Sequence, residues 1–218
     1  MRTEKDKYIP ALSYDWLTAF YDPVVRWTTR EKTFKHRLLQ QANIQPAHRV
    51  LDLGCGTATL TIAIKQAVPK ATVEGLDGDA KILAIARDKA RQAGVEIHFD
   101  EGLSYQLPYT DTVFDRVVSS LFFHHLTTEN KLQTLREVRR VLKAGGELHI
   151  ADWGKPHSSI MRAASFPVRL LDGATTADSF DGLLPRYLQE AGFVDVRTGE
   201  HYATMFGTLW LYQAQQPE

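Results

Sequence analysis

The sequence has one cysteine, no excess of either charge and no long apolar run, and each absence excludes a class of protein. Cys55 has no second cysteine for an intrachain disulfide or a cysteine-rich zinc site, which fits a reducing compartment. Basic and acidic residues number 26 each, so the basic surface of a general nucleic-acid binder is lacking. No segment has the roughly 20 apolar residues that span a bilayer, and the charged amino terminus differs from a signal peptide. We therefore expect a cytoplasmic protein that neither binds nucleic acid nor inserts stably into a membrane.

The length and apolar content fit one domain. A chain of 218 residues with 44% hydrophobic side chains can bury a sizeable core, and we find no internal repeat and no linker-like change of composition. Within a single domain over residues 1–218 we expect four segments: a helical cap over 1–45, a ligand-binding core over 46–152, a lid over 153–185, and a helix with closing strands over 186–218.

Strand-like and helical segments alternate after Pro46. The expected strands read HRVLDLG, ATVEGLD, VEIHF, FDRVVSSL and GELHIAD, with helices over residues 59–68, 79–93 and 129–142. Such alternation predicts right-handed βαβ units and a doubly wound, mostly parallel α/β sheet. The glycines of KAGG, residues 143–146, are expected just past a helix end.

The alternation of strand-like and helical segments is less regular after Asp152. A helix is expected around residues 159–171, although Pro167 argues against an uninterrupted one, and it leads into the polar stretch DGATTADSFDG. A further helix through Gln189 precedes FVDVRTGEHY and FGTLWLYQAQ, which predict two closing strands joined by a short turn.

The stretch VLDLGCGTATLT, residues 50–61, predicts a strand that ends in a glycine turn and opens a helix. This arrangement binds nucleotide-like ligands at the carboxyl edge of a sheet, because glycine lets the backbone approach the ligand. A dinucleotide fingerprint would need Gly or Ala at Thr59, and Asp52 would repel a pyrophosphate but suit an ammonium or sulfonium group. Asp77, about 20 residues after the glycines, is placed to bind ribose hydroxyls. The pattern indicates an adenosine-type ligand without phosphates.

With these motifs the sequence resembles the class I S-adenosylmethionine-dependent methyltransferases. The motifs that carry the resemblance are LDLGCGT, GLDGD, LPYTDTVFDRVVSS and LREVRRVLKAGGELHIAD. The most similar type is the ubiquinone/menaquinone C-methyltransferase, a label that covers many enzymes acting on small molecules. The resemblance implies a seven-stranded Rossmann-like sheet of order 3-2-1-4-5-7-6 with an antiparallel last strand, S-adenosylmethionine as cofactor and a small organic methyl acceptor.

The resemblance also implies a set of cofactor contacts. Gly54 and Gly56 would line the methionine moiety, Asp52 would help to hold its amino end, and Asp77 would bind the ribose hydroxyls. Tyr21 is expected to turn its aromatic face to the sulfonium cation. The remaining contacts that we expect are made by Thr57, Gly78, Gly102, Leu103, Ser104, Ser119 and Ser120.

Two positions depart from the family pattern. Ala58 stands where a third glycine is common, which its methyl group permits if the backbone angle φ there is negative. The family usually has Gly-Asp-Ala, whose acid contacts the adenine amino group, where this chain has Gly-Leu-Ser at residues 102–104. Leu103 could pack on the adenine ring, while its polar edge is left to Ser104, a backbone group, Asp100 or Glu101.

The stretch SSLFFHHL, residues 119–126, follows the fourth expected strand and would border the reacting methyl group. Methyl transfer from a sulfonium is an in-line displacement that needs a base only if the acceptor must lose a proton. Adjacent side chains point in different directions, so His124 and His125 do not form a metal site, and we expect no metal. His124 is a candidate general base, with pocket lining or helix capping as the alternative. At the same edge, either Asp152 or Trp153 is expected to face the acceptor.

The sequence therefore favours a methyltransferase that acts on a small organic acceptor. One alternative is a protein that binds S-adenosylmethionine or S-adenosylhomocysteine without catalysis. A second, an NAD-linked oxidoreductase of the same broad fold, is disfavoured by Thr59 and Asp52. The identity of the acceptor and the oligomeric state have no signal in the sequence.

Overall fold

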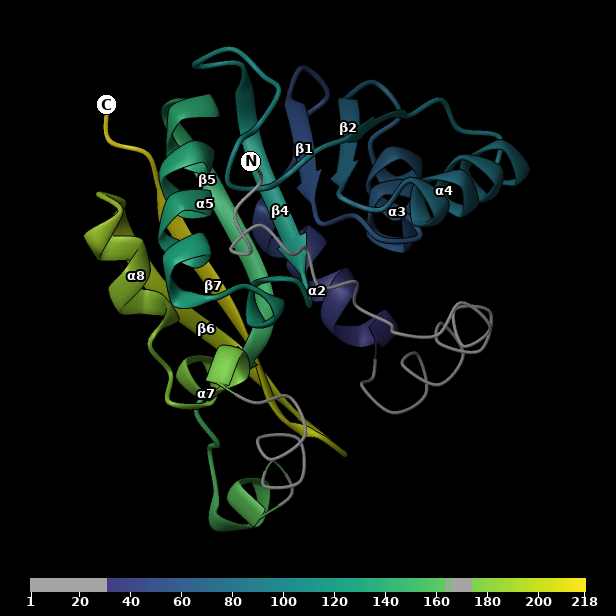
Figure 1. Cartoon of the computed structure of the whole chain (residues 1–218). Helices are drawn as coiled ribbons and strands as arrows, with labels where there is room; N and C mark the ends of the chain where they lie inside the picture. The colour runs from purple at the N-terminus through teal and green to yellow at the C-terminus, as the bar shows by residue number, and fades with distance from the viewer. Residues whose placement is uncertain (1–30, 164, 166–173) are drawn as a thin grey trace, which may run out of the picture.

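Seven strands form one sheet in the order β3-β2-β1-β4-β5-β7-β6 (Figure 1). The structure is a computed structural model, and it describes residues 31–163, 165 and 174–218. Strands β1 to β5 pair in parallel, whereas β7 is antiparallel to both β5 and β6. The expected sheet order and the antiparallel last strand are confirmed. The strands are β1 (Arg49–Leu53), β2 (Thr72–Asp77), β3 (His98–Glu101), β4 (Phe114–Ser120), β5 (Leu142–Gly154), β6 (Val194–Thr204) and β7 (Gly207–Gln215).

Helices cover both faces of the sheet, as the near-continuous apolar sequence of its inner strands requires. Side chains of α2 and α3 pack with one face in a core cluster, and those of α5 and α8 pack with the opposite face in another. In Figure 1, α5 and α8 lie in front of the sheet and α2 lies behind it. The helices are α2 (Glu31–Ala42), α3 (Thr59–Ala67), α4 (Ala80–Gln92), α5 (Thr128–Val141), α7 (Ala174–Phe180) and α8 (Leu184–Glu190), with a short 3-10 helix η2 (Phe123–His125).

Side-chain caps explain where two of the helices begin. Asp79 accepts hydrogen bonds from the backbone N–H groups of Lys81 and Ile82 at the start of α4. Thr127 does the same for Asn130 at the start of α5. Both caps satisfy N–H groups that have no partner within the helix. Within the described ranges, no helix has the length and apolar character needed to cross a bilayer.

Three local expectations differ from the structure. Strand β3 begins at His98, later than the expected VEIHF segment. The KAGG glycines do not cap a helix, because α5 ends at Val141 and the chain enters β5 directly. There they form a bulge, since Phe114 of β4 pairs with Leu142 whereas Arg116 pairs with Glu147. The polar stretch after residue 173 contains the helix α7.

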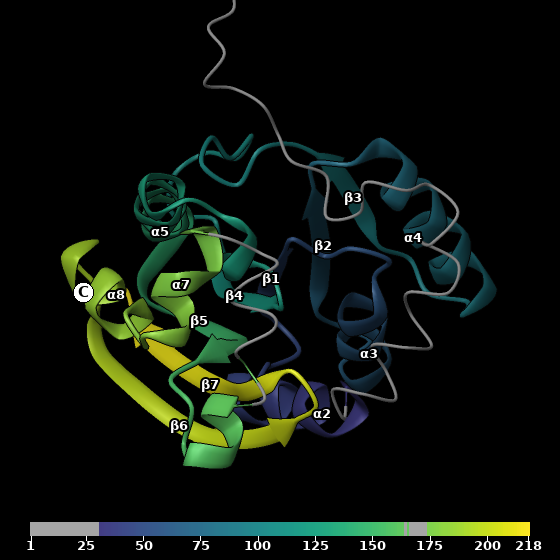
Figure 2. The same cartoon turned by 60° about the horizontal axis from the view of Figure 1, so that its bottom comes forward.

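Contacts with other elements, which its polar sequence does not predict, hold the helix α7 in place. Lys131 of α5, only 1% exposed, forms an ion pair with Asp178 of α7, and the Thr128 hydroxyl donates to the same carboxylate at 3.1 Å. Phe180 at the end of α7 stacks on Trp153 of β5, with 6.3 Å between ring centroids. These contacts hold α7 against η2 and β5, where Figure 2 shows it beside the ends of β4 and β5.

Candidate functional site

The candidate site lies at the carboxyl ends of the parallel strands. Leu53, the last residue of β1, pairs with Leu76 of β2, and Asp52 pairs with Val118 of β4. This register brings the glycine turn after β1, Asp77 at the end of β2 and the segment after β4 to one edge. Ligands of open α/β sheets bind at this edge, beside the point where strand order reverses. The carboxyl ends of β1, β2 and β4 point toward the bottom of Figure 1 and turn toward the viewer in Figure 2.

The glycine turn depends on two residues with a left-handed backbone. Gly54 has a φ of 69° and Gly56 a φ of 54°, which glycine adopts without strain. A Cβ atom added at Gly54 would lie 2.3 Å from the ring of Phe122, so this glycine permits close packing against the segment after β4. A Cβ added at Gly56 would have no atom within 4 Å. Gly56 therefore borders open space, where a ligand can approach the backbone.

Ala58 differs from the expectation for its backbone. Its φ is 63°, in the left-handed region, and not negative as the alanine methyl group would prefer. Ala58 stands directly before α3 and makes no side-chain cap, while its methyl group is fully buried against the core. Tertiary packing thus holds this residue in a conformation that costs about 1–2 kcal/mol for an L residue.

The carboxyl group of Asp52 is buried beneath the turn. It is 2% exposed and accepts a hydrogen bond of 2.6 Å from the Thr61 hydroxyl. Burial raises the pKa of Asp52 to about 6, and one hydroxyl donor offsets only part of that effect. An ammonium group beside this carboxylate would favour its charged form. Asp52 is therefore suited to bind a cationic group.

Asp77 joins the end of β2 to the glycine turn. One of its oxygens accepts the N–H of Gly56 at 2.9 Å, and the other accepts the N–H of Asp79 at 3.1 Å. Burial raises the pKa of Asp77, although these backbone donors act in the opposite direction. Each carboxylate oxygen can accept a further hydrogen bond, so both are suited to a pair of hydroxyls. Gly78 follows it, half-buried, at the same edge.

Thr57 and the segment after β3 border the same edge. The Thr57 hydroxyl oxygen accepts a hydrogen bond from Lys89 of α4 at 2.8 Å. The N–H of Gly102 donates to the backbone oxygen of Asp77 at 3.1 Å, which places residues 102–104 beside the end of β2. Leu103 is 36% exposed there, whereas Ser104 is buried and hydrogen-bonded to Thr134 at 2.9 Å. Leu103 therefore offers an open apolar surface for a flat ring.

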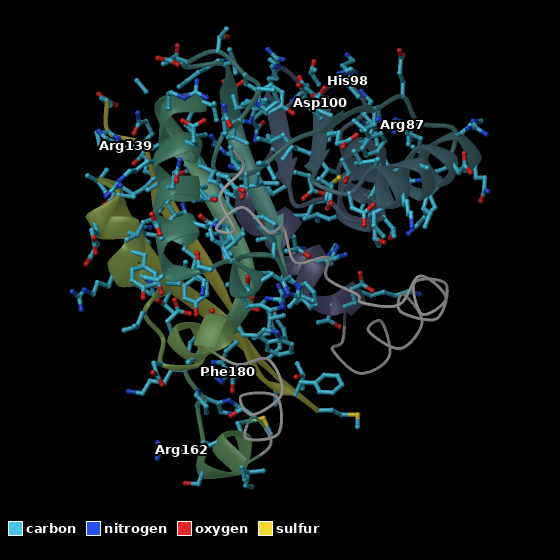
Figure 3. All side chains as sticks on the ribbon, viewed as in Figure 1. Arg87, His98, Asp100, Arg139, Arg162 and Phe180 are labelled. Carbon is cyan, nitrogen blue, oxygen red and sulfur yellow. The ribbon has the colours of Figure 1, made fainter. Side chains whose placement is uncertain are left out.

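Asp100 is already occupied by its own neighbours. His98 contacts one of its oxygens at 2.9 Å, and the Tyr109 hydroxyl donates to the other at 2.8 Å. Figure 3 shows His98 and Asp100 together, well apart from Phe180 of α7. Of the groups considered for the adenine edge, Asp100 is thus bonded to His98 and Tyr109, and Ser104 is buried against Thr134. Glu101 is exposed.

The two serines at the end of β4 differ in their surroundings. Ser119 is fully buried, and its hydroxyl donates to the backbone oxygen of Leu53 at 2.8 Å. It therefore supports the end of β1 directly. Ser120, the last residue of β4, is half-buried. The next residue, Leu121, has a φ of 55°, so the chain turns sharply before η2.

A histidine and an aspartate form a buried pair behind this turn. Nδ1 of His124 lies 2.7 Å from Oδ1 of Asp152, and both side chains are at most 8% exposed. Burial disfavours the Asp152 carboxylate, yet the charge and hydrogen bond of His124 and the N–H of Trp153 hold its pKa below the usual value. Asp152 is held by His124, and Trp153 packs on Phe180. That either of them faces the acceptor stays a prediction.

Sequence reasoning named both members of this pair but did not predict the pairing. His124 lies in η2, shortly after β4, and Asp152 lies 28 positions later in β5, so only the order of the strands could have suggested their contact. In the part of the chain that the structure describes, no three His, Cys, Asp or Glu side chains gather as metal ligands. Tyr21 lies outside the described residues.

Comparison with known proteins gives one matching family and many relatives. Residues 50–146 match the family described as methyltransferase domain. The ubiquinone/menaquinone biosynthesis C-methyltransferase UbiE of Vibrio vulnificus is 33% identical over 168 residues, which cover 72% of this chain and 63% of the relative. A demethylmenaquinone methyltransferase of Bacillus cytotoxicus is 31% identical over 129 residues, covering 58% and 54%. The chain thus spans between about half and two thirds of these relatives.

Solved structures share the fold. An S-adenosylmethionine-dependent methyltransferase of Aquifex aeolicus superposes with a TM-score of 0.68 at 19% identity, covering 96% of this chain and all of the other. The S-adenosylmethionine-dependent methyltransferase SibL gives a TM-score of 0.73 at 22% identity, covering 96% of this chain and 60% of the other. At these identities the likeness establishes the fold alone.

The backbone of Ala58 leads to a stability prediction. Ala58→Gly relieves left-handed strain of about 1 kcal/mol but loses a buried methyl group worth about 0.8 kcal/mol and adds freedom to the unfolded chain. We expect the free energy of unfolding in urea to change by less than about 1 kcal/mol. Ala58→Val, which adds bulk to a buried left-handed position, should lower it by about 2 kcal/mol or more. A glycine variant that is as unstable as the valine variant would contradict this account.

Proposed function

We propose that the protein transfers a methyl group from S-adenosylmethionine to a small organic acceptor. Its residues 50–146 match the family described as methyltransferase domain, which supports the proposal. The observation that carries the proposal is the open face of Gly56 beside the Asp77 carboxylate. Such a turn admits the cofactor to the backbone and offers its ribose an acid. The reaction is an in-line displacement in which the charge of the sulfonium disappears.

We assign the cofactor contacts by group. Gly54 and Gly56 line the methionine moiety, Asp52 lies near its ammonium group, and Asp77 accepts the ribose hydroxyls. Leu103 packs on the adenine ring. The other contacts that we propose are Tyr21, Thr57, Gly78, Gly102, Ser104, Ser119 and Ser120, of which Ser104 and Ser119 act through the backbone they support.

The alternatives receive less support. An NAD-linked oxidoreductase would bring a pyrophosphate to the glycine turn, where the buried Asp52 carboxylate opposes it. A non-catalytic binding protein shares every cofactor contact, so only methyl transfer separates it from an enzyme. The direct test supplies S-adenosylmethionine with a labelled methyl group and a panel of hydroxyl, amine, thiol and carbon acceptors. Label in a product supports the enzyme, and a blank panel with tight cofactor binding supports the alternative.

We also propose the wider setting of this activity. A single domain contains a cap over residues 1–45, a cofactor-binding core over 46–152, a lid over 153–185 and closing elements over 186–218. The equal numbers of basic and acidic residues argue against nucleic acid as a partner, and the single cysteine fits the cytoplasm.

Calorimetry tests the ligand and the ribose contact together. We expect S-adenosylmethionine and S-adenosylhomocysteine to bind and NAD to show no binding. Asp77→Ala should weaken S-adenosylhomocysteine about 10- to 100-fold, because hydrogen bonds to a charged group contribute about 1.5–3 kcal/mol. Asp77→Asn, which keeps one acceptor oxygen, should weaken it less. The control is Asp88→Ala, which removes an exposed acid that pairs with Arg91. Unchanged affinity in Asp77→Ala would exclude the ribose contact.

Asp52 leads to a prediction about protons. Its pKa of about 6 leaves it partly protonated at pH 6 in the free protein. An ammonium group beside it favours the carboxylate, so binding of S-adenosylmethionine should release protons at that pH. The binding enthalpy at pH 6 should therefore depend on the ionisation enthalpy of the buffer.

Asp52→Asn provides the control for this measurement. The variant removes a charge that burial disfavours: the folded carboxyl has a raised pKa, so its charged form costs stability as the pH rises from about 4 to about 6. We expect the variant to fold and to lose the part of the buffer dependence that comes from Asp52. The same buffer dependence in both proteins would assign the proton to another group.

A substitution of Leu103 that raises the affinity for S-adenosylhomocysteine would test its proposed contact with adenine. The family pattern has an acid at this position that contacts the adenine amino group, and Leu103 is already 36% exposed. Leu103→Asp should therefore tighten binding of S-adenosylhomocysteine several-fold, as one hydrogen bond contributes about 1 kcal/mol. Leu103→Asn, which offers the same oxygen without the charge, is the matched variant. Weaker binding of both would indicate that apolar contact with the ring matters more.

A further inference from the structure

The carboxylate of Asp152 is hydrogen-bonded by three neighbouring residues, Phe122, His124 and Trp153. Its Oδ1 lies 2.7 Å from Nδ1 of His124 and accepts the N–H of Trp153 at 2.7 Å. Its Oδ2 accepts the N–H groups of Phe122 and His124 at 3.2 and 3.3 Å. Asp152 is also 1% exposed. Each of its oxygens already has two hydrogen-bond partners in the protein, so its influence on the reaction acts through His124.

These contacts fix the chemistry of the His124 ring. Three backbone N–H groups, those of Phe122, His124 and Trp153, favour the ionised form of Asp152, and an ionised carboxylate only accepts hydrogen bonds. Nδ1 of His124 must then carry a proton. In the neutral ring the lone pair is therefore on Nε2, the nitrogen that can take up a proton. The adjacent carboxylate stabilises the imidazolium that results.

The pair also lies beside the place proposed for the methionine moiety. The ring of Phe122 occupies the space that a Cβ of Gly54 would fill, so the glycine turn and η2 are in contact. His124 is two residues further along η2. On its other side α7 contacts η2 and β5, which limits access of bulk water.

We propose that His124 is the general base of the reaction and that Asp152 is its positioning residue, which presents Nε2 to an acceptor that enters the site protonated. The inference rests on the proposed methyl transfer. The bond between the proton and the acceptor atom breaks, and the proton goes to Nε2. The freed electron pair forms the bond to the methyl carbon, and the carbon–sulfur bond breaks with its electrons on sulfur. The products are the methylated acceptor, neutral S-adenosylhomocysteine and an imidazolium that returns its proton to water.

Other titratable groups around the pair do not compete for this proton. A proton on His124 would repel one on His125, and burial acts in the same direction, so the pKa of His125 is lowered to about 3; the two ring centroids are 3.9 Å apart. Burial raises the pKa of the Tyr212 hydroxyl on β7, which stays neutral. Lys131 and Asp178 neutralise each other in their ion pair. Asp152 is thus the carboxylate that acts on His124.

The test compares two complexes of the intact protein by nitrogen-15 NMR of the histidine rings. S-adenosylmethionine carries a positive sulfur and S-adenosylhomocysteine a neutral one, so only the first repels a proton on a nearby Nε2. We expect the titration midpoint of the His124 ring to be lower in the S-adenosylmethionine complex by about half a pH unit or more. The neutral ring should carry its proton on Nδ1 in both complexes. A purely structural histidine, distant from the methyl group, would show no difference.

Variants assign the signal and test Asp152. His124→Gln removes the resonance, whereas His125→Gln should leave the difference between the complexes in place. Asp152→Asn should lose the preference for a proton on Nδ1. If the Asp152→Asn variant does not fold, the comparison of the two complexes in the unaltered protein still tests whether His124 lies near the methyl group. Equal midpoints in both complexes, or a neutral ring protonated on Nε2, would overturn the proposal. If calorimetry detects binding of neither ligand, the proposed function itself fails.

Discussion

Parallel pairing of β1 with β2 on one side and β4 on the other is the constraint on which the site depends. Because of this pairing, β1, β2 and β4 end at the same edge of the sheet, where residues distant in sequence meet. Gly54 allows the closest of these approaches, since any side chain at that position would collide with the ring of Phe122. The turn after β1 and the helix η2 after β4 can therefore share one small region. Everything proposed for the cofactor and the acceptor follows from this closeness.

Three aspartates at this edge differ in charge because their surroundings differ. Asp52 is bonded by the hydroxyl and the backbone of Thr61, and burial raises its pKa to about 6. Asp77 is bonded by the backbone of Gly56, Gly78 and Asp79, and its pKa is still raised by burial. Asp152 has four donors, including the ring of His124, and its pKa is lowered. One residue type thus provides a carboxyl that can respond to a cation, a pair of acceptors for hydroxyls, and a fixed charge that orients a base.

Much of the fold could be predicted, because apolar periodicity and turn residues are local signals. The family resemblance predicts the sheet order, and the spacing of the glycines predicts the turn. The prediction that KAGG caps a helix is wrong, because a bulge in β5 depends on pairing with β4, which no local pattern records. The sequence pattern does not predict the helix α7, because its stability comes from the Lys131–Asp178 pair and from the packing of Phe180 on Trp153. The left-handed backbone of Ala58 is likewise imposed by packing.

The class of fold, the glycine turn and the identity of the acids near it follow from residue type and short spacing along the chain. Which of those groups are available depends on how the whole chain packs. It engaged Asp100 with His98 and Tyr109, and it joined His124 to Asp152. The physical reason is that a hydrogen bond between distant residues depends on strand order and register, and these arise from the packing of the whole sheet.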